Sequence, residues 1–244
     1  EEGLIKTRLI IPLFMMVFMY SFVPLIINPG NPLGSPDLDF LFSKMDTALF
    51  LGNNPTLSME KWISPLLSEW MAFSYSIYGP FFALVFGCLY LRKENTPIEE
   101  MIFMTTCTLA IGYASYTFFP VKGPMFMQTF NIPLDLYYMK DFKALYMDRP
   151  RIDRDCFPSL HTAVSLVLLY QAKKNLKPLF WTFLPIVICI PMACVYLRYH
   201  YVVDVLAGIG LTFFVIFFTK WMNHKSSFLS ARYVLRLPTL RIKL

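Results

Sequence analysis

Two polar residues in the stretch YLRYHYVVD have the types and spacing of a reactive centre. His200 and Asp204 stand four positions apart, so they share one face if this stretch is helical. A carboxylate bonded to one imidazole nitrogen fixes the tautomer and leaves the other nitrogen to attack or to take a proton. An aspartate inside a membrane span is costly and is usually functional or paired. The pair is therefore a candidate nucleophile or general base.

The stretch PSLH, Pro158 to His161, places a second histidine at the start of a predicted helix. Proline is favoured in the first helical turn, and Ser159 can cap the free backbone N–H groups there. Those groups, with the positive end of the helix dipole, form a natural anion site. His161 lies in the same first turn, where it could donate a proton to a bound anion.

Basic residues accompany both histidines. Arg198 precedes His200 by two positions and could grip an anion through two N–H groups. Phosphoryl transfer depends mainly on positioning and charge stabilisation, and histidines can act in it as nucleophile and as proton donor. The sequence therefore predicts a phosphate site. Its candidate cations are Lys122, Arg149, Arg151, Arg154 and Arg198.

Long apolar segments must position these groups. Of the 244 residues, 56% are hydrophobic and 16% are charged, whereas about a quarter are charged in ordinary soluble domains. Runs of roughly 20 apolar residues can cross a bilayer as helices. We therefore expect an all-α, polytopic membrane protein with a six-helix transmembrane bundle. The predicted spans are Leu9–Ile27, Pro65–Leu91, Met101–Phe119, Phe157–Gln171 (short), Leu179–Tyr196 and Val202–Met222.

The distribution of charge predicts the orientation of these spans. If the N-terminus is cytoplasmic, the inside segments hold most of the 22 basic residues but only five of the 16 acidic ones. This arrangement places both termini in the cytoplasm, and FPVKGP, PSLH and YLRYHYVVD together on the outer face. It accounts for the net charge of +6 without a nucleic-acid partner. Residues 1–222 are predicted to form the catalytic domain, and the basic tail 223–244 to rest on anionic lipid.

Two connecting segments are predicted to cover the substrate. The loop Asn28–Lys61 contains LDFLFSKMDTALFLG, which could form a short amphipathic helix on the membrane surface. The second segment is Met125–Asp148. Cys156 and Cys194 lie near predicted helix ends and could meet, but no spacing argument supports a disulfide between them.

At these motifs the sequence resembles the type-2 phosphatidic acid phosphatase and vanadium haloperoxidase superfamily. Its signature comprises a lysine-containing motif, a Pro-Ser-Gly-His motif and a motif ending in His-x-x-x-Asp. PSLHTA and HYVVDVLAG match the last two, and the resemblance covers mainly Phe119–Gly208. It implies that His200 is the nucleophile and that Asp204 orients it. His161 would be the general acid and then the base that activates water or an alcohol.

The resemblance also implies the phosphate ligands. Ser159 and backbone amides of the helix start would hold phosphate oxygens, and Lys122 would contact the phosphate. Members of the superfamily typically need no metal, and we expect neither a metal nor another cofactor here. The usual first motif ends in Arg-Pro, but Thr129 stands at that distance from Lys122. KALYMDRP is one residue too short, so Arg149 remains the alternative to Lys122.

Two further positions depart from the family pattern. The glycine of the second motif is Leu160, which has less backbone freedom. The usual Ser-Arg of the third motif is Ala193-Cys194. If that stretch is helical, Arg198 lies one turn after Cys194 on the same face and could reach the same phosphate.

The expected function is a lipid phosphatase at the outer membrane face, acting through a phosphohistidine. Candidate substrates are phosphatidic acid, phosphatidylglycerol phosphate, a polyprenyl diphosphate or phosphorylated lipid A. FPVKGP with PSLH also resembles the branch of inositol phosphorylceramide and sphingomyelin synthases, so transfer of a phospho-headgroup between lipids is an alternative. A non-catalytic membrane scaffold or transporter is a third possibility. The compact layout favours a bacterial inner membrane, with the site facing the periplasm.

Overall fold

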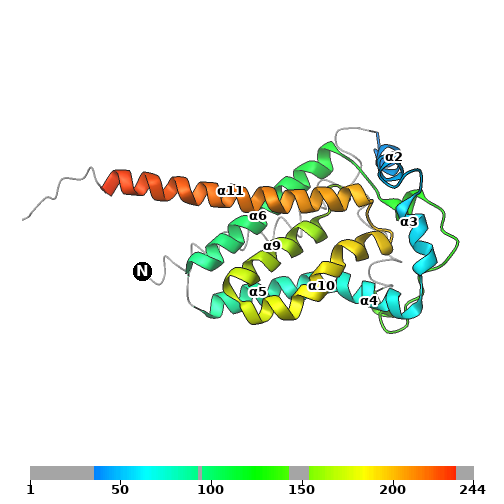
Figure 1. Ribbon diagram of the computed structural model, residues 1–244, viewed down its shortest axis with the longest axis horizontal. Coiled ribbons are helices and arrows are strands. Elements are labelled where there is room, and N and C mark those ends of the chain that lie inside the picture. Colours follow the sequence, from blue (N-terminus) through cyan, green and yellow to red (C-terminus); the bar gives the residue numbers. More distant parts are fainter. Residues whose placement is uncertain (1–35, 93–94, 143–153, 235–244) are drawn as a thin grey trace, which may run out of the picture.

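The computed structural model describes residues 36–92, 95–142 and 154–234, in which the secondary structure is helical and contains no strands (Figure 1). This agrees with the predicted all-α class. The predicted span Leu9–Ile27 and Arg149 lie outside the described residues. The helices are α2 (Asp39–Leu49), α3 (Pro55–Ser58), the 3-10 helix η1 (Met59–Trp62), α4 (Pro65–Ser76), α5 (Tyr78–Leu91), α6 (Asn95–Phe118), α7 (Pro124–Met127), α8 (Lys140–Phe142), α9 (Leu160–Asn175), α10 (Lys177–Tyr196) and α11 (Val202–Val234).

Three of these helices, α6, α10 and α11, are long and apolar enough to cross a membrane. The predicted span Pro65–Leu91 is divided into α4 and α5, which are bent by 41° relative to one another. Such a pair is either a broken span or a re-entrant loop. The described residues therefore contain three candidate spans, or four if the bent pair is one span, which fits a multi-pass membrane protein. The six-span count and the location of the termini stay predictions.

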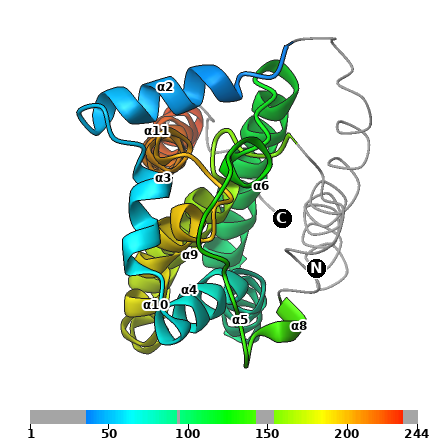
Figure 2. The ribbon, with the colours of Figure 1, turned by 90° about the vertical axis from the view of Figure 1, so that its right-hand side faces the viewer.

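Helix α9 lies at the centre of the bundle, where α5, α6, α10 and α11 pack against it (Figure 2). It has 16 residues, which is short for a membrane span. Its polar side chains Thr162, Ser165 and Gln171 are fully buried. Polar side chains at membrane depth normally face the interior of a bundle. Contact with four neighbouring helices allows α9 to carry these polar side chains, and its 16 residues are too few for it to count among the candidate spans.

Local sequence signals determine where the helices begin. The Ser64 hydroxyl accepts a hydrogen bond from the Leu67 amide, and Pro65 occupies the first position of α4. Ser159 caps α9 in the same way by accepting from the Thr162 amide. Each cap satisfies a backbone N–H group that would otherwise lack a partner at the start of its helix.

Helix α2 confirms the predicted helix in LDFLFSKMDTALFLG. It lies across the end of the bundle beside the start of α11 (Figure 2). Its buried residues are Asp39, Phe42 and Asp46, which recur along one face. Two acidic residues thus occupy the face that meets the protein, which the amphipathic pattern did not indicate. The expected contact of α2 with the membrane surface stays a prediction.

Helix α11 continues without a break from Val202 to Val234. It therefore passes through position 222, where the catalytic domain was predicted to end. The described residues do not test whether the basic tail is a separate unit, and residues 235–244 lie outside them. The domain division stays a prediction.

Candidate active site

The two histidines predicted to act together lie side by side. The ring centroids of His161 and His200 are 6.2 Å apart, with 61° between the ring planes. His161 is in the first turn of α9, and His200 is in the short link between α10 and α11. The neighbouring starts of two helices thus bring together side chains that are distant in sequence.

A buried carboxylate lies behind His200. Asp204 Oδ2 is 3.6 Å from His200 Nδ1, and Asp204 is fully buried. The contact does not arise from one turn of helix, as the spacing predicted, because His200 precedes α11. Instead, Asp204 lies in the first turn of α11 and accepts a hydrogen bond of 2.9 Å from the Tyr201 amide just before the helix. This backward contact brings the carboxylate to the imidazole.

Ser159 is fully buried at the start of α9. Its hydroxyl accepts from the Thr162 amide and donates to Thr162 Oγ1 at 3.1 Å. Its backbone N–H donates to the Asp204 carbonyl at 3.0 Å. A Cβ added to Gly208 would lie only 2.5 Å from the Ser159 carbonyl oxygen, so glycine allows α11 to approach closely. Ser159 therefore fastens α9 to α11, and its predicted contact with phosphate stays a prediction.

Leu160, which replaces the family glycine, is accommodated by another glycine. A Cβ added to Gly112 on α6 would lie 2.4 Å from Leu160 Cδ2. The side chain of Leu160 therefore occupies the space that Gly112 leaves, and it is buried there. The larger side chain in the second motif is thus accommodated beside Gly112 of α6.

Aromatic side chains from α4 and α5 surround His161. The ring of Tyr75 stacks on the imidazole with centroids 4.2 Å apart, and its hydroxyl is 3.2 Å from Nδ1. Tyr78 lies 4.9 Å from the same imidazole. The sequence analysis missed both tyrosines, because neither belongs to a motif. Both lie inside the predicted span Pro65–Leu91, where nothing in the sequence sets them apart from other aromatic residues.

Two of the predicted cations, Lys122 and Arg154, contact Asp37. Lys122 Nζ is 3.0 Å from Asp37 Oδ2, and Arg154 Nε donates to Oδ1 at 2.7 Å. Burial raises the pKa of Asp37, but the hydrogen bonds and positive charges of Arg154 and Lys122 outweigh it and hold that pKa below its usual range. Since Arg149 lies outside the described residues, the choice between Lys122 and Arg149 stays open.

Arg198 does not lie where the helical interpretation placed it. Helix α10 ends at Tyr196, and Arg198 adopts a left-handed conformation with φ +69°. Its guanidinium donates to the Ile132 carbonyl, lies 3.5 Å from Glu60 and covers the Phe130 ring. The assumed position one turn after residue 194 is therefore wrong. In this structure Arg198 anchors the segment around residue 131, and its predicted contact with phosphate stays a prediction.

Two aspartates on α2 support the site and were not predicted. Asp39 accepts hydrogen bonds from the amides of Lys122 and Gly123 and from the Tyr201 hydroxyl. Burial and the neighbouring Asp39 raise the pKa of Tyr201, so its phenol stays protonated and donates. One carboxylate thus joins the loop that contains Lys122 and Gly123, here called the lysine loop, to the link that carries His200.

The second aspartate, Asp46, caps α11. It accepts hydrogen bonds of 2.8 Å and 3.0 Å from the Val202 and Val203 amides. Burial raises the pKa of Asp46, while these two bonds act in the opposite direction. Asp39 and Asp46 stand seven positions apart and so share one face of a short helix, which was the available signal for a common role.

The lysine loop requires glycine at position 123, and this requirement gives a test. Gly123 has φ +99°, and an added Cβ would lie 2.4 Å from the Tyr199 carbonyl oxygen. We expect Gly123→Ala to destabilise the protein by about 1–3 kcal/mol, the usual cost of such backbone strain. Gly87→Ala is the matched control, because it lies within α5 with nothing near its added Cβ. It should raise stability by about 0.5–1 kcal/mol.

Thermal unfolding of both variants in detergent measures the difference. A Gly123→Ala protein as stable as the wild type would show that the loop adapts, and that the close approach of Gly123 to Tyr199 is not required.

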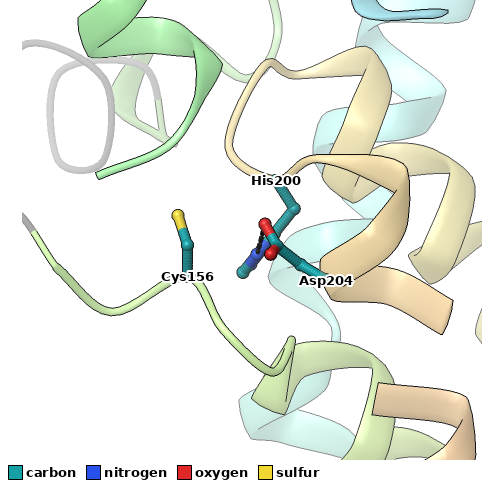
Figure 3. Close-up of side chains that lie close together, drawn as sticks. All are labelled: Cys156, His200 and Asp204. Atoms are coloured by element: carbon teal, nitrogen blue, oxygen red, sulfur yellow. Dashed lines mark ion pairs between the residues drawn. The ribbon is translucent and has the colours of Figure 1, made fainter. Parts of the chain in front are cut away.

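One group of metal-ligating side chains occurs among the described residues. Atoms of Cys156, His200 and Asp204 lie within 4.8 Å of one another, and all three residues are buried (Figure 3). Cys156 and Cys194 are not joined by a disulfide. Because His200 and Asp204 are also the predicted nucleophile and its partner, this cluster coincides with the candidate active site.

Comparison with known proteins places this arrangement in a family. An uncharacterized protein of Methanocaldococcus jannaschii is 30% identical over 155 residues, which cover 62% of this chain and 61% of that protein. The chain thus spans about three fifths of the length of this curated relative. No solved structure matches. The profile of the PAP2 superfamily matches residues 41–218, a range that contains both histidines, Asp204 and most of the helical bundle, and the chain therefore belongs to the PAP2 superfamily.

Proposed function

We propose that this protein is an integral-membrane lipid phosphatase that hydrolyses a lipid phosphomonoester or diphosphate at the outer face of the membrane. His200 attacks phosphorus and forms a phosphohistidine, and the lipid alcohol or phosphate leaves. Water then attacks the phosphohistidine, releasing phosphate and restoring the imidazole. Substrates of this kind include phosphatidic acid, phosphatidylglycerol phosphate, polyprenyl diphosphates and phosphorylated lipid A.

The proposal depends above all on the two imidazoles, whose centroids are 6.2 Å apart with a carboxylate behind one of them. This spacing leaves room for one phosphoryl group between an attacking and a proton-donating nitrogen. In the reaction, the 3.6 Å between Asp204 Oδ2 and His200 Nδ1 shortens so that the carboxylate accepts a hydrogen bond from Nδ1–H, which directs Nε2 toward phosphorus. His161 protonates the leaving oxygen and then removes a proton from water. Backbone amides at the start of α9 and the cation Lys122 or Arg149 stabilise the phosphoryl oxygens.

The proposed location follows from the charge distribution. A multi-pass protein with a cytoplasmic N-terminus and an excess of internal Lys and Arg has this end of the bundle outside. In a bacterial inner membrane the site would face the periplasm, where lipid phosphates of the outer leaflet can enter from the side.

Incubation of the purified protein with phosphate-labelled lipids, with and without a lipid alcohol, tests the function. Hydrolysis predicts release of labelled inorganic phosphate at the same rate in both cases. A new labelled lipid that forms only with the alcohol would instead show phospho-headgroup transfer. If the whole panel of labelled lipids yields neither product, the protein is a scaffold or transporter and the proposal is wrong.

A further inference from the structure

We propose that Cys156, His200 and Asp204 form an inhibitory site for a thiophilic divalent metal ion, with Zn²⁺ as the representative ligand. The three side chains come from the segment before α9, the link before α11 and the first turn of α11. Their ligand atoms lie within 4.8 Å of one another (Figure 3). This inference goes beyond the proposed function, and only the inhibition measurement described below rests on that function.

The distance between His200 and Asp204 suits two ligands of one metal ion. His200 Nδ1 and Asp204 Oδ2 are 3.6 Å apart, which is longer than a normal hydrogen bond. Zn²⁺ binds histidine nitrogen and carboxylate oxygen at about 2.0–2.2 Å, so two such ligands at a tetrahedral angle are separated by roughly 3.4 Å. The pair is therefore already spaced almost as it would be on Zn²⁺.

Unsatisfied polar atoms in the same place support a ligand. His200 Nδ1 and Asp204 Oδ1 are buried and make no hydrogen bond, although the two residues are only 4% and 0% exposed. Buried polar atoms without partners are uncommon and mark strain, function or a missing ion. Two of them on adjacent side chains would both be satisfied by a cation.

Cys156 supplies the third ligand and the selectivity. Its thiol is buried and donates a hydrogen bond of 3.1 Å to the Tyr199 carbonyl. On metal binding the thiol releases its proton to solvent, the bond to Tyr199 is broken and a sulfur–metal bond forms. A thiolate favours Zn²⁺, Co²⁺ or Cd²⁺ over Mg²⁺ and Ca²⁺. Three protein ligands leave the fourth position for water.

Metal binding at this place would stop the proposed reaction. The ion would occupy His200 Nδ1 and separate the imidazole from Asp204, so that the carboxylate no longer directs the ring. It would also fix the ring to the metal and add positive charge to the nucleophile. We therefore expect inhibition by Zn²⁺ and not activation.

Cobalt spectroscopy tests the site without any need for activity. The full chain in detergent, with its affinity tag removed, is titrated with Co²⁺. A bound thiolate produces a sulfur-to-cobalt charge-transfer band in the near ultraviolet. We expect this band at one equivalent in the wild type and in Cys88→Ser, a control on α5. It should be absent in Cys156→Ala, and Zn²⁺ should abolish it in the wild type.

The inhibition measurement uses the same variants. Cys156 takes no part in the proposed phosphoryl transfer, so Cys156→Ala should keep its basal turnover and need at least about tenfold more Zn²⁺ for half-inhibition, the result of losing one metal ligand. Cys88→Ser should remain as sensitive as the wild type. Equal sensitivity of Cys156→Ala and wild type, or loss of the cobalt band in Cys194→Ser but not in Cys156→Ala, would overturn the proposal.

Zinc X-ray absorption of the wild type covers the case in which Cys156→Ala fails to fold. The expected first shell contains one sulfur together with nitrogen and oxygen ligands. A shell without sulfur rejects the site. If the cobalt band and the sulfur ligand are found but no lipid is hydrolysed, the metal site stands and the proposed function fails.

Discussion

Replacement of His200 by alanine should reduce phosphate release by at least about 10⁴-fold, because it removes the atom that forms the covalent intermediate. The fold should survive, since His200 Nδ1 makes no hydrogen bond that holds the helices together. Binding of the lipid should change little, so the loss is expected in kcat.

The intermediate itself gives the sharper measurement. Rapid quenching of the wild type with phosphorus-labelled lipid should leave label on the protein that is labile in acid and stable in alkali, as phosphohistidine is. His200→Ala should carry none. His224→Ala is the matched control, because the third histidine of the chain lies roughly 30 Å further along α11. It should label normally. Label retained by His200→Ala would place the nucleophile elsewhere.

Replacement of His161 by asparagine should slow turnover by about 10²–10⁴-fold, the usual contribution of a positioned acid or base. The effect should depend on the leaving group. An alkyl lipid phosphate needs a proton on its departing oxygen, whereas a nitrophenyl phosphate does not. We expect the first half-reaction of the variant to recover with the nitrophenyl substrate, and labelled phosphohistidine to accumulate because water is no longer activated.

Tyr75→Phe separates this chemical role from a structural one. It removes the hydroxyl that lies 3.2 Å from His161 Nδ1 and keeps the stacked ring. We expect a modest shift in the pH dependence of turnover, without accumulation of the phosphohistidine. If His161→Asn slows both substrates equally and no intermediate accumulates, the residue is not the proton donor.

The sequence was most informative where the chemistry required particular residue types. PSLH and HYVVD place two histidines at the starts of helices. Because the two helices cross the bundle in the same direction, their positive N-terminal ends lie at the same end of it. The structure brings these residues together. The positions of α6, α10 and α11 were also predictable, because long apolar helices have a strong compositional signal.

The parts that could not be predicted depend on contacts between distant segments. The bend between α4 and α5 lies inside a run whose overall apolar composition predicts a single span, although Ser76, Gly79 and Pro80 stand beside the bend. Arg198 looked helical because its left-handed conformation is uncommon for a residue other than glycine. Asp39 and Asp46 looked like the polar side of a surface helix. Only the positions of the Lys122 loop and of α11, more than 80 residues further along, show that this side faces inward.

Leu160 and Gly112 also restrict how this chain can diverge. Because the leucine side chain occupies the volume next to the glycine, a larger residue at position 112 requires that side chain to shift or position 160 to become smaller. We therefore expect the two positions to covary among relatives that share this helix pairing, with a small residue at 112 wherever a branched side chain stands at 160, so that each combination tends to be inherited as a unit.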